Sequence, residues 1–398
     1  MMNNKELKPG WRRVKFGDVV RLSKARSQDP LADGIERYVG LEHLEPGDLR
    51  IRRWGSVADG VTFTSVLQPG QVLFGKRRAY QRKVAVADFS GVCSGDIYVL
   101  ETKDAQVLLP ELLPFICQTD AFFDHAVSTS AGSLSPRTNW TSLAVFEFAL
   151  PPLDEQASLV SLLRTATDAS QAQEHSIKAA ECLLQSFKNE AIGNNTAGVA
   201  KNVLLGEVLL GSPDSGCSAP PREAGTGYFV LGLAALSRHG YVTGDFKPVE
   251  PTSKMLSAKL SKGDLLISRS NTPDRVGYVG IFDDERDDVS FPDTMMRLKP
   301  NPDVIDPIYL EAVLQTTSSR EFLMRIAAGT SASMKKINRA NLLKMPFRLP
   351  KLDAQRAARE QLHDLRAAVV LQRERMAATR SLITQISAAA FAGGRTNV

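Results

Sequence analysis

The sequence contains an internal repeat whose period is half its length. The six residues from Pro151 read Pro-Pro-Leu-Asp-Glu-Gln, and the six from Pro350 read Pro-Lys-Leu-Asp-Ala-Gln. These starts lie 199 residues apart in a chain of 398 residues, and Phe148 and Phe347 keep the same offset. A repeat at a fixed period constrains the architecture before any local pattern does. It predicts two similar halves that present two similar surfaces to a target with two parts.

A long helix is predicted after each copy of the repeated hexapeptide. Apolar and small residues recur at alternating intervals of three and four within 153–193 and again within 352–398, which is the period of paired helices. Gln173 and Gln372 hold equivalent middle positions, where a buried polar side chain would fix the register of the pair. The alternative is two long helices that pack elsewhere in the fold. The residues predicted to pair the helices are Leu163, Ile177, Leu184, Phe187, Leu362, Leu365, Met376, Ile383 and Ile386.

Two blocks that mix short strands, turns and helices make up the rest of the chain. They occupy residues 1–152 and 194–351, and each contains a helical stretch late in the block, at 110–118 and 307–315. The predicted strands are 71–74, 84–87 and 97–100 in the first block, and 264–267, 276–281 and 294–298 in the second. The fold class predicted is therefore mixed α/β (α+β), with a pseudo-two-fold internal repeat.

Composition indicates the cellular compartment and the possible partners of the protein more clearly than it indicates an activity. A net charge of +5 permits an anionic partner without requiring one. No apolar run approaches the roughly 20 residues that span a bilayer, and the first residues lack a hydrophobic signal core, so we expect a cytoplasmic protein. The four cysteines are widely spaced, which favours reduced thiols.

The motifs of common catalytic and cofactor sites are missing or incomplete. Gly70 to Arg77 nearly spells a phosphate-binding loop, but Arg77 stands where a Ser or Thr would hold Mg²⁺, and an apolar strand lies between the glycines. The double prolines at 151 and 220 lack the rest of an amino-methyltransferase motif, and the five histidines are scattered. We therefore expect no catalytic residues, no cofactor site and no metal site in this chain.

Basic, polar loops are the stronger candidates for function in both blocks. Arg can donate two hydrogen bonds to guanine, Gln or Asn can pair with adenine, and Lys and Ser suit phosphates. Asn271 is the natural adenine reader of the second block. The alternative interpretation is solvated or structural turns. The predicted DNA contacts are Lys76, Arg77, Arg78, Tyr80, Gln81, Arg82, Lys83, Ser135, Arg137 and Asn139 in the first block, and Arg269, Ser270, Asn271, Arg275, Ser333, Lys335, Lys336 and Asn338 in the second.

These features together resemble one family. The segments 7–19, 70–100 and 150–156, with the version of the central segment at 263–277, are similar to those of the specificity (S) subunit of type I restriction–modification systems over nearly the whole chain. The resemblance implies two target recognition domains, at 1–152 and 194–351, separated by an antiparallel pair of long coiled-coil helices. Each domain would read half of a bipartite site in double-stranded DNA, and the helices would set the gap. The sequence departs from the repeat at Ala354, where the first copy has Glu155.

The resemblance also implies partners and a division of labour. Two modification (methyltransferase) subunits would dock on the helical regions, and restriction subunits would complete an ATP-dependent nuclease. S-adenosylmethionine, ATP and Mg²⁺ would then belong to those partners. The alternatives are an orphan scaffold or inhibitory relative that binds modification subunits without reading DNA, a self-contained methyltransferase or nuclease, and an RNA-binding protein.

Overall fold

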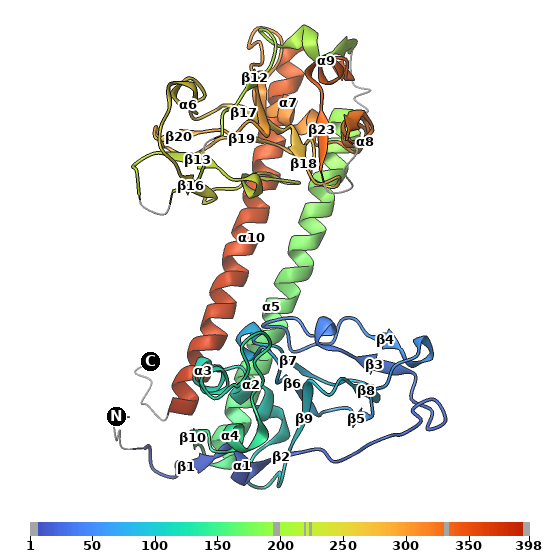
Figure 1. Cartoon of the computed structure of the whole chain (residues 1–398), viewed down its shortest axis with the longest axis vertical. Helices are drawn as coiled ribbons and strands as arrows, with labels where there is room; N and C mark the ends of the chain where they lie inside the picture. Colours follow the sequence, from blue (N-terminus) through green and yellow to red (C-terminus); the bar gives the residue numbers. More distant parts are fainter. Residues whose placement is uncertain (1–6, 194–199, 219, 223–224, 330–333, 393–398) are drawn as a thin grey trace. The chain divides into compact units, whose positions relative to one another are not determined.

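The computed structural model describes residues 7–193, 200–218, 220–222, 225–329 and 334–392. The chain divides into two compact units, and each unit joins a globular α/β part to segments of both long helices (Figure 1). Unit 1 comprises Met1–His175 and Arg373–Val398, and unit 2 comprises Ser176–Gln372. Because these boundaries cut through the helices, the four-part division at 152, 193 and 351 stays a prediction.

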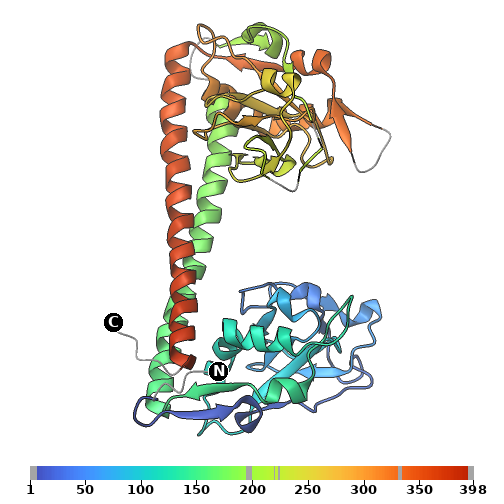
Figure 2. The same cartoon turned by 60° about the vertical axis from the view of Figure 1, so that its left-hand side comes forward.

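The two predicted long helices are present. Helix α5 (Leu153–Phe187) has 35 residues and continues into a π-helical segment, η5 (Lys188–Gly193), and helix α10 (Leu352–Ala392) has 41 residues. Within each unit the segments of α5 and α10 run side by side (Figures 1 and 2). In unit 1 the start of α5 shares a core with the end of α10, so the two segments are antiparallel. The predicted fold class is confirmed.

The residues predicted to pair the helices all lie on covered faces of them. Leu163 is in the core of unit 1, with Ile383 and Ile386 packed against that core. Leu184 and Leu362 are in the core of unit 2. Ile177 is also buried, and Phe187, Leu365, Met376, Gln173 and Gln372 are half-buried. Their neighbours Leu162, Leu183 and Leu382 are 49–58% exposed, so the 3.5-residue period separates covered positions from open ones.

Unit 1 contains two four-stranded sheets and a terminal two-stranded ladder. The central sheet has the order β2-β9-β6-β7, and the second sheet, β4-β3-β8-β5, contains the parallel pair β3 and β8. Phe16, Phe74, Phe122 and Phe148 are fully buried in the main core. The elements are β1 (Arg12–Lys15), α1 (Phe16–Val19), β2 (Val20–Leu22), β3 (Arg37–Val39), η1 (Leu41–His43), β4 (Gly55–Ser56), η2 (Val57–Asp59), β5 (Ser65–Leu67), β6 (Val72–Gly75), η3 (Ala79–Gln81), β7 (Val84–Val86), β8 (Gly91–Cys93), β9 (Ile97–Thr102), η4 (Pro110–Leu112), α2 (Leu113–Cys117), α3 (Asp120–Ser128), α4 (Trp140–Ala144) and β10 (Glu147–Leu150).

Unit 2 repeats this plan in the same chain order. Its central sheet is β12-β21-β17-β19, a second sheet is β16-β13-β20 with the parallel pair β13 and β20, and β11 pairs with β24 as β1 pairs with β10. The elements are β11 (Lys201–Leu204), η6 (Leu205–Val208), β12 (Asp214–Ser215), β13 (Phe229–Leu231), η7 (Leu233–Ala235), β14 (Leu236–Ser237), β15 (Gly240–Tyr241), β16 (Phe246–Pro248), α6 (Ser253–Ser257), β17 (Leu265–Ser268), β18 (Ser270–Asn271), β19 (Val279–Ile281), β20 (Val289–Ser290), β21 (Met295–Leu298), α7 (Pro307–Leu314), α8 (Thr317–Ile326), β22 (Ala327–Ala328), β23 (Lys335–Ile337), α9 (Arg339–Leu343) and β24 (Pro346–Leu349).

The predicted strands and late helices are found at their expected places, with one shortened element. The strand predicted from Val276 begins only at Val279. Gly277 adopts φ +78°, a left-handed conformation that turns the chain and that other residues rarely adopt. The turn therefore takes the residues that the apolar pattern assigned to the strand.

A buried glutamine joins the start of each long helix to the globular part of its own unit. The Gln156 amide donates to the carbonyl oxygens of Val107 and Pro151, both at 2.9 Å, and its oxygen accepts from the Leu109 amide at 2.9 Å. Gln355 makes the same three bonds in unit 2, to Val304 and Pro350 and from Asp306, at 2.9–3.1 Å. The two side chains are 1% and 0% exposed. We call each set of three hydrogen bonds a glutamine clamp. The two clamps explain why the hexapeptide repeats, and they make Leu109 and Asp306 equivalent positions.

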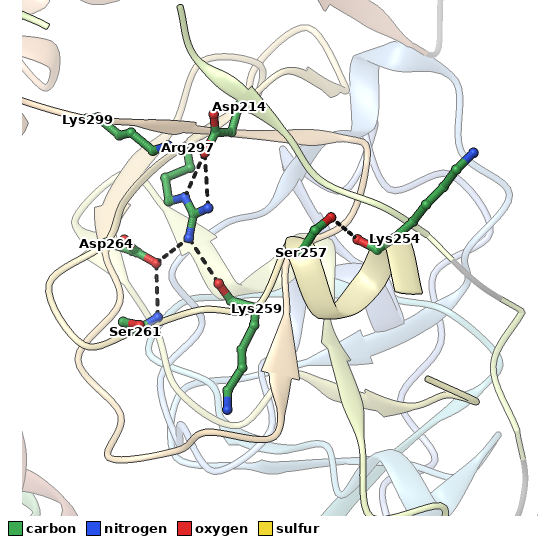
Figure 3. Close-up of polar contacts among 8 residues, drawn as sticks. All are labelled: Asp214, Lys254, Ser257, Lys259, Ser261, Asp264, Arg297 and Lys299. Carbon is green, nitrogen blue, oxygen red and sulfur yellow. Dashed lines mark hydrogen bonds and ion pairs between the residues drawn. The ribbon is translucent and has the colours of Figure 1, made fainter. Parts of the chain in front are cut away.

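An ionic network centred on Arg297 stabilises the central sheet of unit 2. Arg297 of β21 contacts Asp214 at 3.0 Å and Asp264 at 2.9 Å and donates to the Lys259 carbonyl at 3.0 Å, while Lys299 also contacts Asp214 at 2.9 Å (Figure 3). Burial acts to raise the pKa of Asp214, but the hydrogen bonds from Lys299 and Arg297 outweigh it and hold that pKa below its usual value. This network ties β12, the turn before β17, and β21 together.

Candidate nucleic-acid interface

The first predicted basic loop, 76–83, forms a tight turn at the end of β6. Its centre is the single helical turn η3, flanked by Arg78 at φ +54° and Arg82 at φ +56°. Of the residues that the structure describes, these two are the non-glycine residues with positive φ. Such conformations cost free energy and gather at functional sites. The loop is therefore held in a defined shape.

The second basic segment of unit 1 closes directly on this loop. The Thr138 amide donates to the Lys76 carbonyl at 3.0 Å, and the Arg78 amide donates to the Pro136 carbonyl at 2.7 Å. Two segments about 60 residues apart in the sequence thus form one surface, which we call the first basic surface. It comprises Lys76, Arg77, Arg78, Tyr80, Gln81, Arg82, Lys83, Ser135 and Arg137.

Asp96 organises the arginines of the first basic surface. Its carboxylate accepts from Arg77 at 3.2 Å and from Arg137 at 2.8 Å, and the Ser135 hydroxyl accepts from Arg77 at 3.0 Å and Arg78 at 3.3 Å. Burial acts to raise the pKa of Asp96, but the bonds from Arg137 and Arg77 hold it below its usual value. The Asp96 carboxylate contacts two guanidinium groups, and the Ser135 hydroxyl accepts from the third, that of Arg78, so the cluster keeps a net positive charge. Sequence reasoning missed Asp96, because only the fold shows which side chains it meets.

The cations of this surface differ in the number of contacts that their side chains make with the rest of unit 1. Arg82 pairs with Asp120 and lies 4.7 Å over the Phe123 ring. Lys76 lies 4.7 Å over the Tyr98 ring, and Lys83 donates to the Leu41 carbonyl at 2.7 Å. In contrast, Tyr80 is 54% exposed, and Gln81 beside it makes no side-chain hydrogen bond within the described ranges. The tip of η3 therefore presents the side chains most available to a ligand.

Unit 2 joins its two predicted loops in the same way. The Ile337 amide donates to the Arg269 carbonyl at 2.8 Å, which matches the bond from Thr138 to Lys76. Here the contact extends into a ladder in which β18 pairs with β23. The second basic surface comprises Arg269, Ser270, Asn271, Arg275, Lys335, Lys336 and Asn338, while Ser333 lies outside the described residues.

The structure places the side chain of Asn271 inside its own turn. Ser270 and Asn271 are only 8% and 5% exposed, because both lie in β18. The Asn271 amide donates to the Ser268 hydroxyl at 3.2 Å, and its oxygen accepts from the Thr272 amide at 2.9 Å. The Asn271 side chain is thus bonded within its own turn, and its contact with adenine stays a prediction. The exposed residues of this surface are Arg275, Lys336 and Asn338, while Lys335 donates to the Gly329 carbonyl at 2.9 Å.

Asn139 and Asn338 have a structural role at equivalent places. The Asn139 oxygen accepts from the Ser142 amide at the start of α4, and the Asn338 oxygen accepts from the Ala340 amide at the start of α9, both at 2.8 Å. Asn is a favoured N-cap residue because its oxygen satisfies an amide at the helix start. Contact of the two NH₂ groups with DNA stays a prediction. The caps themselves fix the end of each second loop.

The segment that resembles a phosphate-binding loop has a different structure. Val72–Gly75 is the central strand β6, with all four residues buried. No group of three or more potential metal-ligating His, Cys, Asp or Glu side chains occurs among the residues that the structure describes. Within the same ranges, no helix combines the length and apolar character that a bilayer span requires.

Comparisons with known proteins agree with this architecture. No protein-family model matches the chain. A chain from a structure of a type I restriction–modification system, on its complex assembly and conformational transition, is 21% identical, with a TM-score of 0.61 and coverage of 97% of this chain and 98% of that one. The S subunit of a type I system from M. genitalium is 12% identical, with a TM-score of 0.53 and coverage of 98% of both chains. The fold is that of a type I S subunit.

One curated relative adds a similarity in sequence. The chain is 30% identical over 163 residues to the type I restriction enzyme EcoDI specificity subunit of Escherichia coli. The match covers 39% of this chain and 35% of the relative, so it spans about a third of the relative's length.

Proposed function

We propose that this chain is the DNA-recognition subunit of a type I restriction–modification complex, in which each unit reads one half of a bipartite site. The S-subunit fold and the partial similarity to a specificity subunit support this function. The long helices α5 and α10 would set the gap between the half-sites.

One observation carries the proposal: both units join a loop after the central strand to a segment before a short helix by the same main-chain bond. Thr138 donates to Lys76 in unit 1, and Ile337 donates to Arg269 in unit 2. The side chains on these matched frames differ, with Tyr80 and Gln81 on one and Arg275 on the other. Matched frames with unlike side chains suit two half-sites of unlike sequence, since phosphate contacts position a protein and base contacts specify the sequence.

The chemistry of methylation and cleavage would belong to partners. We propose that modification subunits and restriction subunits bind this chain, and that they supply the sites for S-adenosylmethionine, ATP and Mg²⁺. The buried strand at β6 supports this assignment, because it leaves no flexible cradle for nucleotide phosphates. The chain would contribute recognition without catalysis.

The test is to assemble the chain with the modification subunits of its own genome and to map methylated sites on a random DNA library. We expect one bipartite sequence. The double variant R77A/R137A should weaken binding through the first surface, and R275A/K336A should weaken it through the second, with a lower salt dependence in each case. R164A, which removes an exposed cation of α5, is the matched control. An assembled complex that prefers no sequence would indicate a scaffold, and methyl transfer by the chain alone would indicate an enzyme.

A further inference from the structure

The junction between helix and domain uses different chemistry in the two units around the same glutamine clamp. In unit 2 it is ionic: Arg359 of α10 contacts Asp306 at 3.0 Å, and Arg366, two turns further along α10, contacts Glu311 of α7 at 2.8 Å. The side chains of Asp306 and Glu311 are only 10% and 4% exposed. These carboxylates are therefore nearly removed from water.

A buried lysine extends this ionic junction onto the other helix. Lys188 of η5 is 1% exposed, and its ammonium donates to the Gln315 oxygen at 2.6 Å. Burial, followed by the positive charge of Arg366, lowers the pKa of Lys188 to about 8, while Glu311 opposes that shift. The helix side of the junction thus carries three cations, and the domain side carries the groups that receive them.

The same positions in unit 1 carry no charge. The glutamine clamps make Leu109 equivalent to Asp306, and five residues further on Pro114 is equivalent to Glu311; the helix repeat of 199 residues supplies the others. Val160 is buried where unit 2 has Arg359, and Ser387 is buried where unit 2 has Lys188. The unit 1 set is Leu109, Pro114, Val160, Thr167 and Ser387, against Asp306, Glu311, Arg359, Arg366 and Lys188 in unit 2.

Exchanging the domains would therefore leave the cations of the helix side without the carboxylates that face them. If the first domain were seated on the unit 2 helix segments, Leu109 and Pro114 would face Arg359 and Arg366, while Gln118 would stand opposite Lys188 as Gln315 does. Arg359 and Arg366, whose side chains are 40% and 29% exposed, would lose their anions, and Lys188, which is 1% exposed, would lose the nearby negative charge of Glu311. The cost is greatest for the buried cation, because a buried charge without a compensating charge is unfavourable. The loss falls on mismatched combinations and spares matched ones.

We propose that the cations Lys188, Arg359 and Arg366 form a docking key, which accepts the chain's own second domain through the carboxylates of Asp306 and Glu311 and rejects the first domain. The shared glutamine clamp supplies the geometry that both domains fit, and the key supplies the discrimination. The partner that the key excludes is the first domain, whether from the same chain or from a second copy of it.

The test exchanges the domain and the key independently. In one chain, residues 201–349 are replaced by 12–150, which begin and end on the corresponding strands. The triple variant K188S/R359V/R366T, which installs the unit 1 residues, is made in this chimera and in the native chain, and melting is followed by circular dichroism. The variant should lower the Tm of the native chain by about 6 °C or more and raise the Tm of the chimera. A shift of the same sign in both chains, or a chimera that melts like the native chain, overturns the proposal.

A second measurement keeps the proposal testable if the chimera does not fold. In the native chain, E311R and R366E should each lower the Tm, and the double variant should recover at least half of the summed loss. No recovery would overturn the key. R164A is the control, because it breaks the exposed contact of Arg164 with Glu111, at 3.9 Å, and should change the Tm by about 1 °C or less. DNA is absent from these assays, so their outcome is independent of the proposed DNA recognition.

Discussion

The two basic surfaces share one backbone connection but stabilise it by different means. In unit 1 a carboxylate, Asp96, holds two arginines that come from separate segments. In unit 2 the equivalent segments pair as strands, β18 with β23, and the polar side chains of β18 turn inward. The difference shows that the frame is set by main-chain bonds, which leaves the outward side chains free to diverge.

The largest expected effect tests whether the two frames are as alike as their hydrogen bonds indicate. Q156A and Q355A each leave one amide and two carbonyl groups of the main chain buried without partners, at about 1–3 kcal/mol for each such group. We expect each variant to lose about 3 kcal/mol or more of unfolding free energy in urea, by similar amounts. A loss confined to one of them would break the equivalence of the clamps.

A middle-sized effect tests whether the surfaces read different sequences. Q81A in unit 1 and R275A in unit 2 each remove an outward side chain, and each should cost about 1–3 kcal/mol of binding if the side chain reads a base. Gel shifts at fixed salt, with one half-site altered at a time, should assign the two losses to opposite half-sites. Equal losses on every sequence would instead assign both residues to phosphates.

The smallest expected effect concerns the carboxylate that is present in only one surface. The pKa of Asp96 is lowered in the folded state, so its contribution to stability is present above about pH 4 and is lost as the pH falls through the folded value. D96N should therefore be less stable than the native chain at pH 7, by about 1 kcal/mol or less because the site is partly solvated, and this deficit should shrink near pH 2. Urea unfolding at both pH values measures it. A deficit that does not change with pH would show that the carboxylate charge does not support the loop.

The duplication could be predicted because two segments repeat at one offset. The covered faces of the long helices and the central strands could be predicted because each rests on a pattern within one segment. The junction of residues 76–83 with 131–139 could not, since it depends on a fold that brings distant segments together. The burial of Asn271 could not be predicted for a related reason, because a residue type does not show on which face of β18 its side chain lies. The caps Asn139 and Asn338 did carry a usable signal, because each stands directly before a short helix at the period of the repeat.

The pairing of β11 with β24 has a consequence for the helices that flank it. The second domain is a connection of about 150 residues between α5 and α10, and a flexible connection of that length would oppose their association through its closure entropy. Once Lys201 lies opposite Leu349, the two helices are joined as if by a short hairpin. Folding of the second domain thereby raises the effective concentration of one helix segment for the other within unit 2. Stability of the domain and association of the helix ends are thus thermodynamically linked.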